Sequence, residues 1–183
     1  WSPERRVAAG MAHVPQGRQV FKSLTVEANL RVGGYTLSRA ERRAMGERLE
    51  RAYATFPLLA DRRRQLAGTL SGGQQASLAV ARALISDPSL VLIDEPSAGL
   101  APAVVEELLE TLSNVRRTGV TMLLVEQNIR FGLRLADHAV LLQQGRVVYE
   151  GQAGKLDEAE LAARLGVGRL LGKDLKAGLK KRR

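Results

Sequence analysis

The chain has 183 residues, a hydrophobic fraction of 45%, a net charge of +9 and no cysteine. This length suits one domain with a real core, and the lack of cysteine excludes disulfide frameworks and thiolate metal sites. No apolar run in the sequence is long enough to cross a bilayer.

The positive charge is concentrated at the C-terminus. Residues 166–183 hold seven basic residues and one acidic residue, a net charge of +6, which leaves +3 for the rest of the chain. Such tails are usually solvated, so we interpret residues 166–183 as a solubilising basic tail, with weak contact to anionic lipid or RNA as the alternatives. Aromatic residues make up only 4% of the chain, which disfavours a specific nucleic-acid partner.

The N-terminal half is predicted to contain one short strand and several helices. Residues 7–14 predict a strand that Pro15 ends, and a turn follows at residues 16–18. Thr25 suits the N-cap of the next helix. Residues 38–53 predict one strongly charged helix that begins with a capping box.

The C-terminal half alternates between strands and helices. The predicted elements are a helix at 75–86, a strand at 90–95, a helix at 102–115, a strand at 120–125, a helix at 130–136, and a hairpin of strands 139–142 and 147–149. Gln144 and Gly145 are the expected hairpin turn. This alternation predicts an α/β layer with a parallel sheet, whereas residues 17–86 predict an all-helical insertion.

Ser71, Gly72 and Gly73 stand where the helix after them begins. The first N–H groups of a helix have no intrahelical partner and attract anions. Glycines let an anion approach these groups closely, and the serine hydroxyl adds a donor. Taken alone, these three residues predict no more than a capped turn.

Asp94 and Glu95 follow the apolar strand residues 90–93. A carboxylate at the carboxyl end of a strand can hold Mg²⁺, and a second one beside it can orient and deprotonate an attacking water. Taken alone, the pair is also compatible with a polar strand end. Both motifs together, in this order and spacing, indicate half of a nucleotide-hydrolysing site.

These motifs resemble those of ATP-binding cassette (ABC) ATPases. The stretch Leu70–Gln74 resembles their signature motif, Leu90–Glu95 their Walker B strand, and Pro96–Leu100 their D-loop. Gln16 stands where the family places its Q-loop glutamine. The runs His13–Arg18 and Leu124–Asn128 resemble the subgroup that imports branched-chain amino acids, with urea and amide importers as related alternatives.

The resemblance implies a partial P-loop NTPase (RecA-like) core with a parallel sheet and an α-helical signature subdomain. The implied domains are residues 1–16 with 87–165 for the core, 17–86 for the helical subdomain, and 166–183 for the tail. The implied cofactors are ATP and Mg²⁺. The implied partners are a second ATPase subunit in a homo- or heterodimer, transmembrane permease subunits and a separate solute-binding protein, at the cytoplasmic face of a prokaryotic membrane.

The resemblance also implies a role for each matching residue. Asp94 and Gln16 would bind Mg²⁺, and Glu95 with Gln127 would act in catalysis. Contact with the γ-phosphate of ATP held by the opposite subunit is implied for Ser71, Gly72, Gly73 and Gln74. Contact across the dimer interface is implied for Ser97, Ala98, Gly99 and Leu100.

The sequence departs from the family pattern at two points that bear on catalysis. Gln127 stands where most cassettes carry a histidine, and a glutamine cannot become cationic there. The chain also contains no G-x-x-x-x-G-K-S/T loop, and only 15 residues precede Gln16. We therefore expect an N-terminally incomplete chain that does not bind ATP tightly by itself.

Three functions remain open from the sequence. The first is the ATPase subunit of an importer, and the second is a non-hydrolytic partner that supplies only its signature motif to a complete cassette. The third, a cassette acting on nucleic acid or ribosomes, is disfavoured because no long coiled-coil insertion or tandem cassette is present in the sequence.

Overall fold

The computed structural model describes residues 1–156. The predicted basic tail, residues 166–183, lies outside the described residues. The chain divides into two compact units, residues 1–127 and 128–183, and each unit is described by itself.

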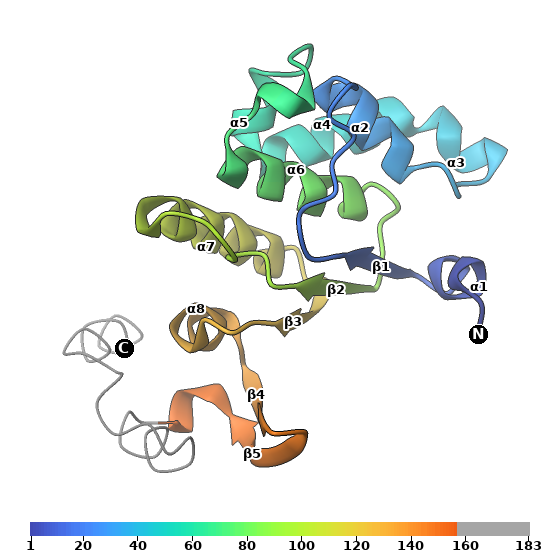
Figure 1. Ribbon diagram of the computed structural model, residues 1–183. Coiled ribbons are helices and arrows are strands. Elements are labelled where there is room, and N and C mark those ends of the chain that lie inside the picture. The colour runs from blue at the N-terminus through green and yellow to red at the C-terminus, as the bar shows by residue number, and fades with distance from the viewer. Residues whose placement is uncertain (157–183) are drawn as a thin grey trace. The chain divides into compact units, whose positions relative to one another are not determined.

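A parallel sheet of three strands forms the centre of the first unit (Figure 1). The strands are β1 (Met11–Val14), β2 (Leu90–Asp94) and β3 (Thr121–Val125), and β2 lies between the other two. Val14 pairs with Ile93, and Ile93 pairs with Leu124. Burial of Val14, Val91 and Ile93 holds the strands in this register. The predicted α/β layer with a parallel sheet is therefore confirmed.

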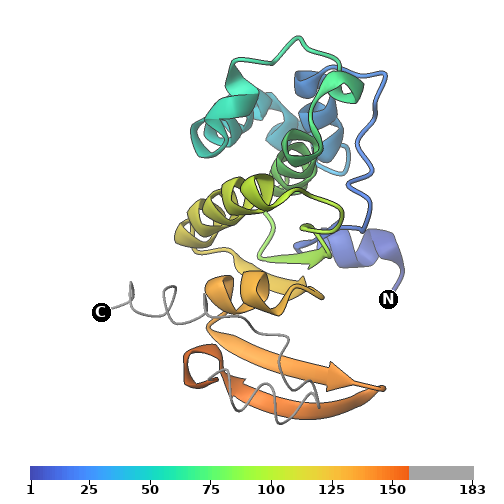
Figure 2. The same cartoon turned by 60° about the vertical axis from the view of Figure 1, so that its left-hand side comes forward.

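Two long helices, α6 (Gly72–Leu84) and α7 (Pro102–Arg117), lie on the same side of these strands (Figures 1 and 2). In α7 the buried residues repeat at helical spacing, which gives the helix one apolar face that packs into the core. The buried residues of α7 are Leu108, Leu109, Leu112 and Val115. The helix α6 packs against both α7 and β1.

Apart from α1, described below, the remaining helices of this unit fall between residues 17 and 86. They are α2 (Val26–Gly33), α3 (Arg39–Arg43), α4 (Met45–Thr55), α5 (Pro57–Ala60) and the short 3₁₀ turn η1 (Ala67–Thr69). The Thr25 hydroxyl accepts a hydrogen bond from the N–H of Ala28, which confirms it as the N-cap of α2. The predicted division of the chain into core and helical subdomain stays a prediction.

The predicted single helix at 38–53 is wrong, because the chain turns at Ala44 and forms α3 and α4 instead. The expected capping box between Ser38 and Glu41 is present at the start of α3. The turn lets α4 bury Leu49 and Tyr53, whereas α3 buries no residue. The charged helix therefore divides so that only its amphipathic part enters the core.

Two contacts hold α2 in place, one to α6 and one to the loop that precedes α2. A Cβ atom on Gly33 would lie 2.1 Å from the carbonyl oxygen of Arg82, so the two helix backbones touch where only glycine fits. Asn29 is fully buried. Its side chain accepts a hydrogen bond from Phe21 N–H at 2.8 Å and donates to the carbonyl oxygens of Phe21 and Thr25, both at 3.0 Å.

The N-terminus also differs from the prediction, because residues 7 and 8 belong to a helix, α1 (Pro3–Ala8), and not to a strand. Ser2 caps this helix, and Pro3 occupies its first turn, where its fixed φ suits a helix. Gly10, at φ +84, reverses the chain before β1 begins at Met11.

The second unit contains the helix α8 (Ile129–Leu135) and an antiparallel hairpin of β4 (His138–Gln143) and β5 (Arg146–Gln152). A short 3₁₀ turn, η2 (Ala153–Lys155), follows β5. Gln144 and Gly145 connect the strands at φ +49 and +75, which confirms the predicted two-residue turn. Within residues 1–156, none of the helices combines the length and apolar character that a membrane span requires.

Candidate functional site

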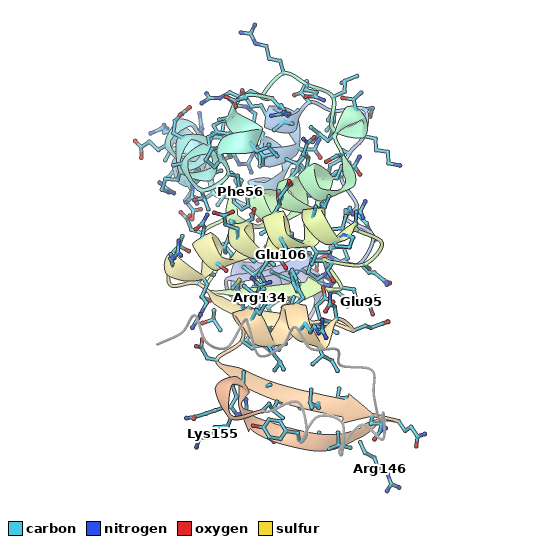
Figure 3. All side chains as sticks on the ribbon, turned by 90° about the vertical axis from the view of Figure 1, so that its left-hand side faces the viewer. Phe56, Glu95, Glu106, Arg134, Arg146 and Lys155 are labelled. Atoms are coloured by element: carbon cyan, nitrogen blue, oxygen red, sulfur yellow. The ribbon has the colours of Figure 1, made fainter. Side chains whose placement is uncertain are left out.

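The candidate site forms where the carboxyl ends of β1 and β2 meet. Because the two strands are parallel and Val14 pairs with Ile93, Gln16 and Glu95 leave the sheet at the same edge. Asp94 is the last residue of β2. Figure 3 shows Glu95 at the end of the strands, apart from Phe56 among the helices that precede α6.

Two glutamine amides hold the Glu95 carboxylate. Gln16 donates from Nε2 to Oε2, and Gln127 donates from Nε2 to Oε1, both at 2.7 Å. The backbone N–H of Glu95 donates to the carbonyl oxygen of Val125 at 2.9 Å. The residue has φ +44, a left-handed conformation that side-chain-bearing residues adopt only where their surroundings impose it. The structure thus brings together three predicted site residues from separate strand ends.

The D-loop, residues 97–100, begins with a buried serine and continues as an exposed turn. The Ser97 N–H donates to Oε1 of Glu126 at 2.9 Å, and the Leu100 N–H donates back to the carbonyl oxygen of Ser97 at 3.2 Å. Gly99 takes φ +66. Ala98 and Gly99 are therefore exposed at the surface of a turn that is fixed at both ends.

The signature residues form the first turn of α6, which begins at Gly72, three residues earlier than predicted. Ser71 and Gln74 close a capping box: the Ser71 hydroxyl accepts from Gln74 N–H at 3.3 Å, and the Gln74 side chain accepts from Ser71 N–H at 3.0 Å. The side chain of Gln74 is thus used within the turn. The N–H groups of Gly72 and Gly73 are first-turn donors for which a helix offers no acceptor.

Packing also favours glycine here, firmly at Gly73 and less so at Gly72, where the neighbouring atom is the movable end of the Arg18 side chain. A Cβ atom on Gly73 would lie 2.2 Å from Cγ1 of Val104 in α7, and one on Gly72 would lie 2.7 Å from Nη1 of Arg18. Sequence reasoning assigned these glycines only to the approach of an anion. The contacts show that they also let α7 and the turn of residues 16–19, called the Gln16 loop below, pack against α6.

A cavity of about 430 Å³ joins these segments. Its lining residues are Val14, Pro15, Gln16, Gly17, Arg18, Ala76, Ala79, Asp94, Glu95, Pro96, Ala98 and Gly99. The cavity therefore has carboxylates and an amide at one side and small residues of α6 at another. Ser71 and Gln74 are not part of this lining.

The donor set suits Mg²⁺ and not a metal that binds several protein ligands. Magnesium usually takes one or two carboxylates and completes its shell with water and phosphate oxygens. Asp94 supplies a carboxylate. Gln16 uses its amide nitrogen on Glu95, which leaves its amide oxygen as the atom to face a cation. Among residues 1–156, no group of three or more His, Cys, Asp or Glu side chains forms a metal site.

Sequence reasoning gave no role to two arginines near the site. Arg18 donates from Nη2 to the carbonyl oxygen of Ala98 at 3.2 Å, and Arg82 donates from Nη1 to that of Gln19 at 3.0 Å. Burial lowers the pKa of Arg82 from its ordinary value. The sequence offers one sign that Arg82 has a structural role, its place on the inward face of α6. Its partner cannot be predicted in this way, because the acceptor is a backbone carbonyl 63 residues away in sequence.

A family model described as "ABC transporter" matches residues 2–98. The chain belongs to the ABC transporter family. This confirms the resemblance that the signature, Walker B and D-loop residues carry in the sequence.

Two curated relatives share much of their sequence with this chain. The chain is 46% identical over 138 residues to the high-affinity branched-chain amino acid transport ATP-binding protein BraG of Pseudomonas aeruginosa, covering 75% of this chain and 58% of BraG. It is 38% identical over 167 residues to the probable branched-chain amino acid transport ATP-binding protein LivF of Archaeoglobus fulgidus, covering 91% of this chain and 70% of LivF. The chain thus spans less than two thirds of BraG.

Solved structures share the fold. CbiO1 from Clostridium perfringens, described as part of the ABC transporter complex cbiONQ, superposes with a TM-score of 0.75 at 22% identity. The match covers 98% of this chain and 70% of that one. The predicted fold class, a P-loop NTPase core with a parallel sheet, is therefore confirmed.

Proposed function

We propose that the full-length protein is the ATP-hydrolysing subunit of an ABC importer for branched-chain amino acids. The observation that carries the proposal is the Glu95 carboxylate, which lies beside Asp94 at the end of β2 and is held by the amides of Gln16 and Gln127. The names of BraG and LivF support branched-chain amino acids as the solute.

In this proposal Glu95 orients the attacking water and accepts its proton. The two amide hydrogen bonds fix both carboxylate oxygens, so the base is oriented before the water arrives, and each oxygen keeps a second lone pair that can accept from the water. Bound Mg²⁺ would neutralise charge on the phosphates. The oxygens of Asp94 and Gln16 would hold that ion.

The first turn of α6 serves ATP that is bound by a second subunit. The N–H groups of Gly72 and Gly73 and the Ser71 hydroxyl would donate to its γ-phosphate. The structure supports a narrower role for Gln74, whose side chain caps Ser71. The D-loop, residues 97–100, would cross the interface of the resulting dimer through its exposed turn.

The proposal places the protein at the cytoplasmic face of a prokaryotic membrane. Its partners would be a second ATPase subunit, transmembrane permease subunits and a separate solute-binding protein. This assignment rests on the family and on the relatives' names. Weak contact of the basic tail with anionic lipid stays a prediction, because residues 166–183 lie outside the described part of the chain.

A second candidate is a non-hydrolytic partner that supplies only the signature turn in trans. One observation favours it: the first turn of α6, with its capping box between Ser71 and Gln74, is fully formed in this chain. In that case Glu95 would be dispensable, whereas Ser71 would not.

Comparing Ser71→Arg with Glu95→Gln in the assembled complex separates the two candidates. If the protein hydrolyses ATP at its own site, each substitution lowers the rate of Mg²⁺-dependent phosphate release. If it serves only in trans, Ser71→Arg lowers the rate and Glu95→Gln leaves it unchanged. Unchanged rates with both substitutions contradict both candidates.

A further inference from the structure

The turn after Gln16 has positive φ at three successive residues, and two of them, Arg18 and Gln19, carry side chains and are strained there. Gly17, Arg18 and Gln19 have φ values of +81, +67 and +38. The Gln19 N–H donates to the carbonyl oxygen of Gly17 at 2.7 Å, which closes a tight three-residue turn centred on Arg18. Left-handed conformations cost side-chain-bearing residues about 1–2 kcal/mol each, so this turn persists only because other contacts hold it.

Two guanidinium groups supply those contacts. Arg18 reaches out of the turn and donates to the carbonyl oxygen of Ala98 in the D-loop, at 3.2 Å. Arg82 reaches in from α6 and donates to the carbonyl oxygen of Gln19 at 3.0 Å. The Arg82 guanidinium also lies over the Phe21 ring, 5.1 Å from its centroid. The turn is therefore attached to the D-loop on one side and to α6 on the other.

The Arg18 guanidinium also lies against the first turn of α6. A Cβ atom on Gly72 would lie 2.7 Å from Arg18 Nη1 and 3.2 Å from Cδ2 of Leu100. One side chain thus touches the start of α6 and binds the D-loop, and it belongs to the loop whose Gln16 holds Glu95. No other described side chain is shown to link these three segments.

We propose that Arg18 is a positioning residue that holds the Gln16 loop, the D-loop and the first turn of α6 in one arrangement. By fixing the strained turn, it keeps the Gln16 amide on the Glu95 carboxylate. The inference deepens the proposed function and rests on it for its effect on hydrolysis. Arg18 acts through the protein and not by touching the nucleotide.

Loss of the Arg18 side chain removes one of the two attachments of the turn. Gln16 then leaves Glu95 for part of the time, and the base is oriented less often. Misplacement of a catalytic group by about 1 Å costs up to about a hundredfold in rate, so we expect Arg18→Ala to lower kcat about tenfold to a hundredfold. The KM for ATP changes less than about threefold, because Asp94 is unaffected and α6 stays packed against α2 and α7.

The test measures ATP hydrolysis by the full-length protein in its assembled complex. The variants are Arg18→Ala, Arg18→Lys, Gln16→Ala and the double variant, with the exposed Arg64→Ala as the matched loss of one positive charge. If Arg18 acts through Gln16, the double variant is no slower than Gln16→Ala alone. Arg18→Lys keeps one donor for Ala98 and recovers most of the rate.

Two kinetic results would overturn the inference while leaving the proposed function intact. If the fold losses in kcat of the two single variants multiply in the double variant, Arg18 acts independently of Gln16. A raised KM with unchanged kcat in Arg18→Ala means that the guanidinium binds nucleotide directly. Absence of hydrolysis by the wild-type protein contradicts the proposed function instead.

Amide hydrogen exchange tests the arrangement itself, without requiring activity. The N–H groups of Ala98 and Leu100 donate to the carbonyl oxygens of Glu95 and Ser97. Arg18→Ala should speed their exchange by about tenfold, which corresponds to an attachment of about 1.4 kcal/mol. Arg64→Ala should leave these rates unchanged. Equal exchange in Arg18→Ala and wild-type protein would overturn the inference.

Discussion

Replacing Glu95 by glutamine tests the role of the carboxylate at atomic detail. Both oxygens of Glu95 accept an amide N–H, one from Gln16 and one from Gln127. In Glu95→Gln one oxygen becomes an NH₂ group, so one of the two glutamines faces a donor and keeps a bond only by turning its own amide oxygen toward it. A hydrogen bond to a charged group contributes about 1.5–3 kcal/mol, and the remaining amide side chain cannot accept a proton from water.

The expected effect on hydrolysis follows from the second loss. A positioned general base contributes about 10²–10⁴-fold, so kcat of the full-length protein should fall by that range, equivalent to about 3–5 kcal/mol in the barrier. ATP binding persists, and the protein should accumulate as an ATP-bound dimer. The assay is phosphate release at saturating Mg²⁺ and ATP, with gel filtration in ATP to measure the dimer.

Glu110→Gln is the matched control, because it removes one carboxylate from an exposed position on α7. Its kcat should equal that of the wild-type protein. The reasoning is refuted if Glu95→Gln retains wild-type turnover, because the carboxylate would then be neither the base nor the group that orients the water.

Three further substitutions test how the fold supports this site. Asn29→Ala should lower the free energy of unfolding by about 2–4 kcal/mol, because it leaves buried backbone groups unpaired. The control Asn114→Ala on α7 should change the free energy of unfolding by no more than about 0.5 kcal/mol. Equal urea midpoints for the two variants would contradict this prediction. Gly73→Ala should cost about 1–3 kcal/mol by overpacking, and adding Val104→Ala should recover part of the loss in the same assay. The Tyr53 hydroxyl is buried without a hydrogen-bond partner among residues 1–156, so Tyr53→Phe should raise the free energy of unfolding by about 1 kcal/mol. Burial raises the pKa of Tyr53 above its ordinary value, so this tyrosine ionises at lower pH in the unfolded chain than in the folded protein. The wild-type protein should therefore lose stability as pH rises above about 10. The same loss in Tyr53→Phe would show that Tyr53 is not its cause.

The candidate catalytic and binding residues can be predicted from the sequence better than the segments that position them. Asp94, Glu95 and the signature glycines could be found because short motifs at strand and helix ends carry a direct chemical reason. The capping boxes at Ser38 and Ser71 could also be found, because both partners lie within four residues.

Contacts between distant segments could not be predicted in this way. The bonds from Arg18 to Ala98 and from Arg82 to Gln19 join residues 80 and 63 positions apart, and their acceptors are backbone carbonyls with no sequence signature. The break at Ala44 has only Gly46 as a nearby signal in the sequence, because the other residues of 38–53 mostly favour a helix and the packing of α4 decides where the chain turns.

The central claim is that this site powers solute uptake, and reconstituted vesicles test it most directly. The full-length protein is assembled with its permease subunits and binding protein, and uptake of labelled leucine is measured together with phosphate release in Mg²⁺ and ATP. The account predicts that uptake requires hydrolysis and stops in Glu95→Gln. It also predicts that unlabelled valine and isoleucine compete with leucine, whereas urea and amides do not. Uptake that continues in Glu95→Gln, or competition by urea alone, would contradict it.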